Sequence, residues 1–408
     1  MGVVSCGTTM LDQGVFNNIG AVTWDTTAKT GNFTGVSGNG YFVNTTSGSI
    51  TVTLPSSPSA GNIVGIKDYA NTAGTNKIVV GRNGSNIQGT AANFDLVTSG
   101  GSVLLVYVDG TQGWKVTSAS EAADLQSTQY VVATGGTITT SGDYRIHTFT
   151  GPGTFCVSNA GAPGGSAKVD YVVVAGGGAG GSGQGGAGGG GAGGHRVSYP
   201  SPAGTIPVSV QGYPITVGSG GSGVTAPSPV GGSGSNSVFS TITSAGGGGG
   251  AKQPNGNGAS GGSGGGGSID GGCGGAGNTP PVSPSQGNPG GNGPGNGTSI
   301  KAGGGGGASA AGQNGTPGPA AGGAGSANSI TGSSVTRAGG GGGSVSCQPA
   351  GGAGGAGGGG AGGGGGSPGS AGTANTGGGS GGGSPSPGSS PSANGGSGVV
   401  IITYKFRN

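Results

Sequence analysis

The chain contains 408 residues, of which 116 are glycine, and only 6% of its residues are charged. The formal net charge is +3 and lysine and arginine form no cluster, so electrostatics give no case for nucleic-acid or membrane binding. No segment approaches about 18 consecutive apolar residues, and the start of the chain lacks the basic and apolar stretches of a signal peptide. We therefore expect synthesis in a cytoplasm, with any exterior position reached by assembly or lysis.

Residues 1–20 are assigned to an N-terminal attachment segment, and residues 21–118 are predicted to form an all-β module. In this module, runs of β-branched and aromatic residues are separated by turn residues that recur about every 8–12 positions. Trp24 and Trp114 are expected to close the edges of its core. The strongest expected strands are 40–44, 49–54, 62–67, 77–80 and 103–108.

Residues 119–127 are the only helix-friendly stretch, and they are predicted to be a linker with at most one helical turn. Residues 128–408 are predicted to form a β sandwich that carries large glycine-rich insertions. Its last strand, 399–406, is strongly β-prone and follows a long glycine-rich tract, so its partners must lie far upstream. The other expected strands are 144–149, 154–157, 169–174, 206–210, 214–217 and 238–243.

The glycine-rich insertions span about residues 176–205, 218–236 and 246–397. Glycine loses roughly 0.5–1 kcal/mol more than alanine at each ordered position, so an ordered tract needs compensating interactions. A strict Gly-X-Y repeat is absent, which excludes a collagen triple helix. The alternatives are a flexible Gly/Ser linker and polyglycine II, in which left-handed extended strands bond laterally through their amides and carbonyls. We expect polyglycine II, because flexible linkers are rarely followed by a strand that needs upstream partners.

Proline, asparagine, threonine and serine gather between the glycine runs, which are themselves bounded by alanine or serine. Such stretches are typical of turns that reverse the chain. The most pronounced are 253–256, 278–286 and 384–388. Charged residues are scarce over 246–397, where they are limited to Lys252, Asp270, Lys301 and Arg337. We expect the loops between glycine runs to carry the binding surface of the protein.

Gly176, Gly178 and Gly181 follow an apolar strand with the spacing of a dinucleotide-binding motif. That motif requires a helix directly after the strand and an acidic residue about 20 positions further on. The continuation is glycine-rich and cannot nucleate a helix, so we expect no cofactor. His195 and Arg196 follow a glycine run, and we expect them at an exposed corner between the glycine bundle and the sandwich.

The four cysteines show no zinc-type spacing, and with only His147 and His195 to join them a metal site is not expected. Cys156 is expected to be a small buried apolar residue. Cys273 and Cys347 lie in glycine tracts, and the sequence leaves open whether they pair. No residue is assigned a catalytic, cofactor-binding or metal-binding role, and the protein is not expected to be an enzyme.

Long motifs run through both halves of the chain. In the first half they are Trp24-Asp-Thr-Thr27, Asn32-Phe-Thr-Gly-Val-Ser-Gly-Asn-Gly-Tyr-Phe-Val43, Ile50-Thr-Val-Thr-Leu-Pro55, Ile66-Lys-Asp-Tyr-Ala70, Arg82-Asn-Gly-Ser-Asn-Ile87 and Val106-Tyr-Val-Asp-Gly-Thr-Gln-Gly-Trp114. In the second half they are His147-Thr-Phe-Thr-Gly-Pro-Gly-Thr-Phe155, Val169-Asp-Tyr-Val-Val-Val-Ala-Gly-Gly-Gly178, Pro207-Val-Ser-Val-Gln-Gly-Tyr-Pro-Ile-Thr-Val-Gly218 and Gly398-Val-Val-Ile-Ile-Thr-Tyr404. Over nearly the whole chain, these motifs resemble tail-fibre-like virion proteins of marine cyanobacterial phages, in which a repeat module is followed by a glycine-rich domain.

The resemblance implies a bacteriophage virion structural protein without enzymatic activity, made in the host cytoplasm and placed on the virion exterior. We expect a tail fibre or adhesin that presents host-envelope-binding loops from a rigid polyglycine scaffold. Its composition is also similar to the polyglycine II sandwich at the tip of some T-even-like phage adhesins. The alternative is a purely structural head fibre, decoration or appendage protein without receptor binding. An envelope-degrading depolymerase would need clustered carboxylates on a long β-helix, and none is visible in the sequence.

The partners that the resemblance implies are other virion proteins, bound through the N-terminal region, and a host cell-surface glycan or outer-membrane protein. Viral fibres are usually homotrimers, so a homotrimer is expected, although no heptad or collagen repeat encodes one. No nucleic-acid partner is expected. The receptor, and the loops that would contact it, are not encoded in any motif.

Overall fold

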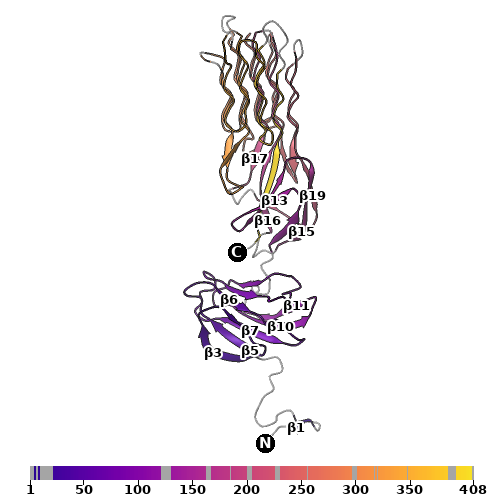
Figure 1. Ribbon diagram of the computed structural model, residues 1–408, viewed down its shortest axis with the longest axis vertical. Coiled ribbons are helices and arrows are strands. Elements are labelled where there is room, and N and C mark those ends of the chain that lie inside the picture. Colours follow the sequence, from indigo (N-terminus) through magenta and orange to yellow (C-terminus); the bar gives the residue numbers. More distant parts are fainter. Residues whose placement is uncertain are drawn as a thin grey trace. The chain divides into compact units, whose positions relative to one another are not determined.

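The chain folds into an all-β protein, drawn in Figure 1 from a computed structural model. The structure describes residues 4–5, 8–9, 22–120, 130–161, 167–183, 185–199, 205–225, 230–254, 256–295, 301–316, 318, 320–346, 348–384 and 392–406. These residues contain no helix, and so none that is long and apolar enough to cross a membrane. They belong to two compact units, whose boundary falls between Gln129 and Tyr130.

The strands of the first unit are β3 (Thr23–Lys29), β4 (Phe33–Thr34), β5 (Asn39–Val43), β6 (Ile50–Thr53), β7 (Ile63–Asp68), β8 (Ile78–Gly81), β9 (Phe94–Leu96), β10 (Ser102–Asp109) and β11 (Gly113–Ala119), besides a hairpin of β1 (Val4–Ser5) and β2 (Thr8–Thr9). They form two sheets, in the orders β11-β10-β7-β5-β3 and β4-β6-β8-β9. From β3 to β8 the chain alternates between the sheets and neighbouring strands run parallel, so the chain coils like a short solenoid. β9, β10 and β11 join antiparallel.

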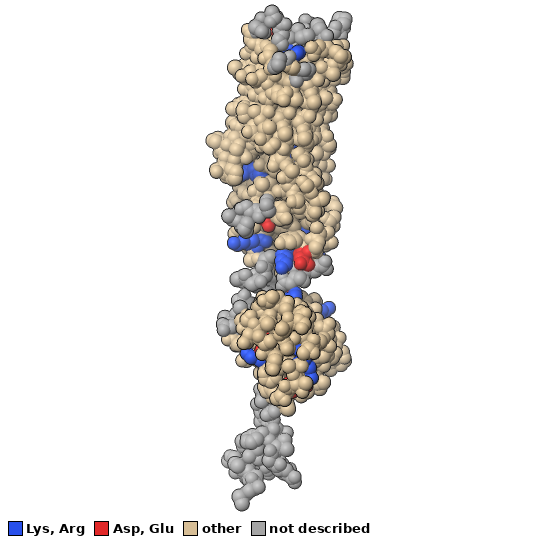
Figure 2. Space-filling model, turned by 90° about the vertical axis from the view of Figure 1, so that its left-hand side faces the viewer, with Lys and Arg blue, Asp and Glu red and all other residues tan. Residues whose placement is uncertain are grey.

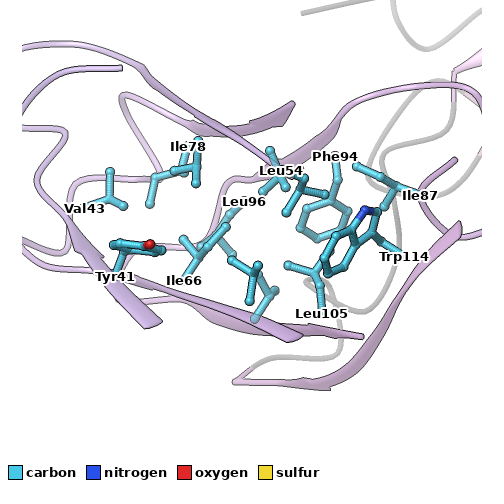
Figure 3. Packing of buried hydrophobic residues seen from close by; sticks show 14 of the residues in the cluster. Tyr41, Val43, Leu54, Ile66, Ile78, Ile87, Phe94, Leu96, Leu105 and Trp114 are labelled. Atoms are coloured by element: carbon cyan, nitrogen blue, oxygen red, sulfur yellow. The ribbon is translucent and has the colours of Figure 1, made fainter. Parts of the chain in front are cut away.

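Apolar side chains from both sheets fill the core of the first unit, as Figure 3 shows. Tyr41 and Ile66 come from one sheet, and Ile78 and Phe94 come from the other. Trp114 is completely buried beside them. The five expected strands of this module are confirmed as β5, β6, β7, β8 and β10.

Trp24 does not close this core, and that prediction is wrong. Its side chain is 40% exposed and lies on the outer face of the sheet, where its ring centroid is 5.0 Å from that of Phe42. A Cβ atom at Gly40 would lie 2.7 Å from the indole ring, so the ring covers this glycine. An aromatic residue indicates a strand, but by itself it does not reveal which face of an edge strand its ring occupies.

The second unit contains a β sandwich. Its strands are β12 (Val131–Thr134), β13 (Thr137–Ser141), β14 (Tyr144–Phe149), β15 (Gly153–Ala160), β16 (Lys168–Val174), β17 (His195–Val197), β18 (Ile206–Pro207), β19 (Gly212–Thr216), β20 (Ser237–Phe239), β21 (Ile242–Ser244), β22 (Ser326–Asn328), β23 (Val335–Arg337) and β24 (Val399–Lys405). One sheet has the order β12-β15-β19-β20-β21 and the other β13-β14-β24-β16-β17, with β18 beside β16. Phe155 and Phe239 of the first sheet pack against Tyr171 and Val400 of the second. β22 and β23 form a separate hairpin.

The last strand, β24, lies in the middle of its sheet, which confirms that its partners are far upstream. Ile402 faces His147 of β14 on one side and Tyr171 of β16 on the other, both in antiparallel register. Both faces of β24 and β16 are buried. Val400 and Val173 face the other sheet, whereas Val172, Val174, Val399 and Ile401 pack with Ile330, Ala192 and Ala338 of the glycine-rich half. Burial on two faces explains why these strands are continuous apolar runs.

Three predictions about the path of the chain differ from the structure. The expected strand 238–243 is the hairpin of β20 and β21, because Ser240 takes a positive φ of 52° and reverses the chain. The expected strand 206–210 is limited to β18. The expected linker 119–127 starts within β11, which ends at Ala119, and its residues from 121 on lie outside the described residues.

Glycine-rich segments run side by side away from the sandwich (Figure 1). We call them the glycine bundle: residues 175–194, 218–236, 245–325 and 338–398, as far as the structure describes them. The end that joins the sandwich strands is its near end, and the opposite end is its far end. Since β16 leads directly into the segment 175–183 and β17 directly follows the segment 187–194, the turn between these two segments lies at the far end.

Backbone amides three residues apart in the bundle donate to the same neighbouring segment. In the segment 187–194, the donor–acceptor pairs are Gly188–Ala251, Gly191–Gly248 and Gly194–Ala245 toward one neighbour, Gly189–Gly303 and Ala192–Gly306 toward a second, and Gly190–Ser380 and Gly193–Gly377 toward a third. Strands alternate with a period of two and α-helices bond within themselves, so neither gives this repeat.

Position in the bundle explains which residues are glycine. Residues 302–307 and 338–345 are buried throughout, and a Cβ atom at Gly190 would collide with the carbonyl oxygen of Gly178. At the surface of the bundle, one residue in each turn points outward: Cys273 and Ala276 are exposed, while Gly272 and Gly275 are buried. Inner segments are therefore continuous glycine runs, and outer segments show a local X-Gly-Gly pattern.

Candidate functional site

The loops that were expected to form the binding surface lie at both ends of the glycine bundle. The loop 278–286 lies at the near end, because the carbonyl of Gln286 accepts the amide of His195 in β17 at 2.9 Å. The side-chain oxygen of Gln286 also accepts the amide of Ala245 at 2.8 Å, and Gln286 is only 1% exposed. Through these hydrogen bonds of the buried Gln286, the loop connects the glycine bundle to β17 of the sandwich.

The loop 253–256 lies at the far end. Cβ atoms built at Gly183 and Gly185 would touch Gln253, and these glycines flank the far-end turn. Of the loop 384–388, the structure describes Ser384, whose hydroxyl donates to the carbonyl of Val345; the rest lies outside the described residues. Two of the three expected loops thus start at the far end and one lies at the opposite end.

The four charged residues of 246–397 are also divided between the ends. Asp270 lies two positions after Ser268, whose hydroxyl accepts the amide of Gly256 in the far-end loop at 3.0 Å. Arg337 ends β23 at the near end and is 8% exposed. Lys252 directly follows Ala251, which accepts the amide of Gly188 at the far end. Lys301 lies beside Val345, next to Ser344, whose hydroxyl accepts the amide of Ala187 at 2.7 Å. Figure 2 shows that the side of the bundle between its ends is almost free of charged residues.

His147 and Tyr404 form a buried hydrogen-bonded pair inside the sandwich. Nδ1 of His147 lies 2.7 Å from the carbonyl oxygen of Gly135, which can only accept, so Nδ1 carries the proton. Nε2 then accepts from the Tyr404 hydroxyl at 3.0 Å, and this hydroxyl accepts the amide of Ala133 at 3.2 Å. Burial lowers the pKa of His147, so the imidazole is neutral at pH 7. Every polar atom of the pair is satisfied, which indicates a structural role.

His195 is buried, although an exposed corner was expected, and that prediction is wrong. The side chain of His195 is 8% exposed, and its Nε2 has no hydrogen-bond partner among the described residues. Arg337 is the charged group that affects its pKa. Burial, and to a lesser extent Arg337, lower the pKa of His195 to about 4. Arg196, the next residue, is half-buried on the other face of β17. The alternation of the strand, rather than the end of the glycine run, decides which of the two faces inward.

Cys156 is exposed, and the prediction that it is buried is wrong. The alternation of β15 points Phe155 and Val157 into the core and Cys156 away from it. Cys273 is free and exposed, and Cys347 lies outside the described residues. Within the described parts of the chain, histidine, cysteine and acidic residues nowhere form a group of three or more that could hold a metal ion.

Gly176, Gly178 and Gly181, which match a dinucleotide motif, belong to the glycine bundle. Their amides donate to Ser235, Gly191 and Gly188 of two neighbouring segments at 2.8–3.0 Å. A Cβ atom at Gly181 would collide with the carbonyl oxygen of Ala251. The amides that would contact a pyrophosphate are thus engaged within the protein, and the glycines are explained by close packing of backbone against backbone.

Sequence reasoning missed the exposed asparagine and serine side chains that accept amides at the surface of the bundle. Asn257, for example, accepts the amide of Cys273 through Oδ1 at 2.9 Å, and Ser260 accepts that of Ala276 at 3.2 Å. Their signal in the sequence is the asparagine and serine residues that interrupt the outer glycine runs.

Comparison with known proteins finds one family. Residues 148–405 match the model of a family described as a glycine-rich domain. The match begins in β14 and ends with β24, so it includes the bundle and most of the sandwich strands. No curated protein matches the chain.

Proposed function

This chain belongs to the glycine-rich domain family, and we propose that it is a bacteriophage virion structural protein, a tail fibre or adhesin whose far-end loops bind the host envelope. Two findings support the proposal. The match to the family covers the glycine-rich half. The motifs of the first half, such as Asn32–Val43, resemble the repeat module of tail-fibre-like proteins of marine cyanobacterial phages.

The glycine bundle, in this proposal, is a polyglycine II scaffold. Its amides bond laterally with a repeat of three residues, as the donors of segment 187–194 do. Each such bond contributes about 1 kcal/mol net, which offsets the roughly 0.5–1 kcal/mol entropic cost of ordering a glycine. A scaffold held by backbone hydrogen bonds in place of side-chain packing has no cavities to collapse and few side chains to rearrange. It is therefore suited to hold loops rigidly at a distance from the sandwich.

The observation that carries the proposal is the convergence of separate segments at the far end. The backbone of Gly188 bonds to Ala251, that of Ala302 bonds to Ser344, and the Ser344 hydroxyl accepts the amide of Ala187. The turn after Gly183 and the residues Lys252 and Lys301 consequently belong to one surface. Polar loops on a rigid base are the usual arrangement of binding sites.

The test uses the purified full-length chain, labelled with a fluorophore, and cyanobacterial host cells. Binding to the cells, and competition with phage adsorption, is the expected result. The far-end variant Lys252→Ser/Lys301→Ser should bind more weakly, whereas the control Lys29→Ser/Lys115→Ser, in the first unit, should not. A protein that is found on the virion by immunogold labelling but neither binds cells nor competes would be the purely structural head fibre, decoration or appendage protein, and host binding would be excluded.

The homotrimer and the attachment to other virion proteins through the N-terminal region are part of the same proposal. They rest on the resemblance alone. Sedimentation equilibrium of the full chain gives the stoichiometry directly, and a mass of one or two chains would contradict the trimer. Deletion of residues 1–20 should abolish incorporation into virions without changing cell binding.

A further inference from the structure

The surface of the glycine bundle differs from its interior in the acceptors that are available to backbone amides. Inside, every amide of residues 188–194 donates to a carbonyl of a neighbouring segment. An amide of an outer segment that has no carbonyl of a neighbouring segment to donate to would resemble the unpaired amide of an edge strand. Unpaired edges recruit further chains. A bundle built from backbone alone is particularly exposed to this, because any other extended glycine segment, including one from a second copy, would fit.

Side chains accept many of these surface amides. The amide–acceptor pairs are Gly223 with Asn394, Val224 with Ser392, Gly246 with Asn236, Gly249 with Ser233, Cys273 with Asn257, Gly274 with Asn292, Ala276 with Ser260, Asn292 with Asn314, and Ala321 with Gln313, at 2.7–3.3 Å. All these acceptors except Ser392 are exposed. They thus lie where the bundle ends and solvent begins.

The acceptors follow the same repeat of three as the interior. The amides of Gly246 and Gly249 go to Asn236 and Ser233, which are also three apart. The amides of Cys273 and Ala276 go likewise to Asn257 and Ser260. Each side chain therefore stands in for the carbonyl that the next segment of the bundle would have supplied at that position.

Asparagines connect successive outer segments in a row. Oδ1 of Asn314 accepts the amide of Asn292 at 2.8 Å, and Oδ1 of Asn292 accepts the amide of Gly274 at 2.8 Å. On the other side of the segment 272–277, Asn257 accepts the amide of Cys273. In these outer segments, exposed asparagine side chains therefore act as acceptors for the amides of the adjacent segment.

We propose that these exposed asparagine, serine and glutamine side chains terminate the glycine bundle: they occupy the surface donors to which an extended glycine segment of a second copy would otherwise bond. The proposal does not depend on the host-binding function. It assigns these polar side chains a role in keeping the glycine bundle of each chain closed.

The test compares the full-length chain with the variant Asn257→Ala/Asn292→Ala/Asn314→Ala. Hydrogen exchange should become about tenfold faster at the amides of Cys273, Gly274 and Asn292, and interior amides such as that of Gly188 should stay protected. Sedimentation velocity should show association that increases with concentration. The matched control is Ser222→Ala/Ser370→Ala, which removes exposed bundle hydroxyls for which the described residues offer no hydrogen-bond partner; it should behave as the parent protein does.

Two results would overturn the proposal. Unchanged exchange at the three amides would show that the side chains do not occupy them, and faster exchange without association would show that freed donors recruit no second copy. If the triple variant loses protection at Gly188 as well, the single variant Asn292→Ala replaces it. That variant frees the amide of Gly274 alone and is judged by the same two measurements.

Discussion

Nε2 of His147 lies 3.0 Å from the hydroxyl of Tyr404, although 257 positions separate the two residues in the chain. The pair joins β14 to the C-terminal strand and, through the amide of Ala133, to the opposite sheet. Removing one partner leaves buried polar groups unsatisfied, and the cost of that exceeds the net value of a hydrogen bond. The stability of the sandwich is therefore expected to depend on the hydroxyl oxygen of Tyr404.

Tyr404→Phe should therefore destabilise the second unit by about 1–3 kcal/mol, because Nε2 of His147 and the amide of Ala133 both lose their partner. Urea unfolding followed by circular dichroism measures the change. Tyr144→Phe is the matched control, since Tyr144 is 43% exposed and should tolerate the loss of its hydroxyl. Equal effects of the two substitutions would contradict the hydrogen-bonding scheme.

Acid should weaken the second unit. The pKa of His195 is lowered to about 4, and that of His147 is lowered as well, whereas histidine in an unfolded chain titrates near 6.5. Between these values the unfolded chain takes up protons and the folded chain does not, so the free energy of unfolding falls as the pH decreases from about 6.5 toward 4. His195 alone contributes about 3 kcal/mol to this loss, and His147 acts in the same direction.

The first unit provides an internal control for this pH dependence. It contains both tryptophans and neither histidine. Tryptophan fluorescence should therefore report a transition without the histidine contribution, while circular dichroism of the whole chain shows it. His195→Gln should flatten the dependence of the second unit between pH 6.5 and about 4, and an unaltered slope in that variant would assign the effect to other groups.

Phe155→Ala should destabilise the sandwich by about 3–5 kcal/mol, the usual cost of removing a buried aromatic ring. The ring of Phe155 is completely buried and contacts those of His147, Tyr213, Phe239 and Tyr404. Cys156→Ser, one position on, should change stability by less than about 0.5 kcal/mol because Cys156 faces outward. A large effect at Cys156 would mean that the register of β15 is shifted by one residue.

Gly190→Ala should disrupt the interior of the glycine bundle, since the added methyl group collides with the backbone of Gly178. Overpacking of this kind costs about 1–3 kcal/mol or more where backbone cannot move away. Gly295→Ala is the control: its nearest neighbour would be 3.9 Å from the new Cβ. Hydrogen exchange across the bundle distinguishes the two, and similar protection in both variants would contradict the close packing.

The sequence predicts a strand reliably where the strand is a continuous run of apolar residues. β16 and β24 are buried on both faces, so their apolar runs stand out from the surrounding glycine, and the position of β24 after the bundle requires distant partners. The faces of mixed strands were not predictable. Cys156, His195 and Trp24 were each assigned to the wrong environment, because a shift of one residue in register exchanges the two faces.

The sequence predicts even less about which loops lie at which end of the glycine bundle. The loops 253–256 and 278–286 have similar composition, yet they lie at opposite ends. Which end a loop occupies depends on how many segments precede it, and short turns such as the one at residues 261–262 leave no signal in a sequence that is already glycine-rich. The sequence shows where the exposed asparagines are. It does not show which backbone amides they accept, because that depends on which segments are neighbours in the bundle.

The central place of β24 has a consequence for synthesis of the protein. β14 and β16 leave the ribosome long before the strand that must lie between them, and the bond from Ala133 to Tyr404 spans 271 positions. Until β24 is synthesised, the edges of β14 and β16 that pair with it have no partner strand. Such intermediates aggregate readily, so we expect the yield of folded protein to depend on how fast translation reaches β24.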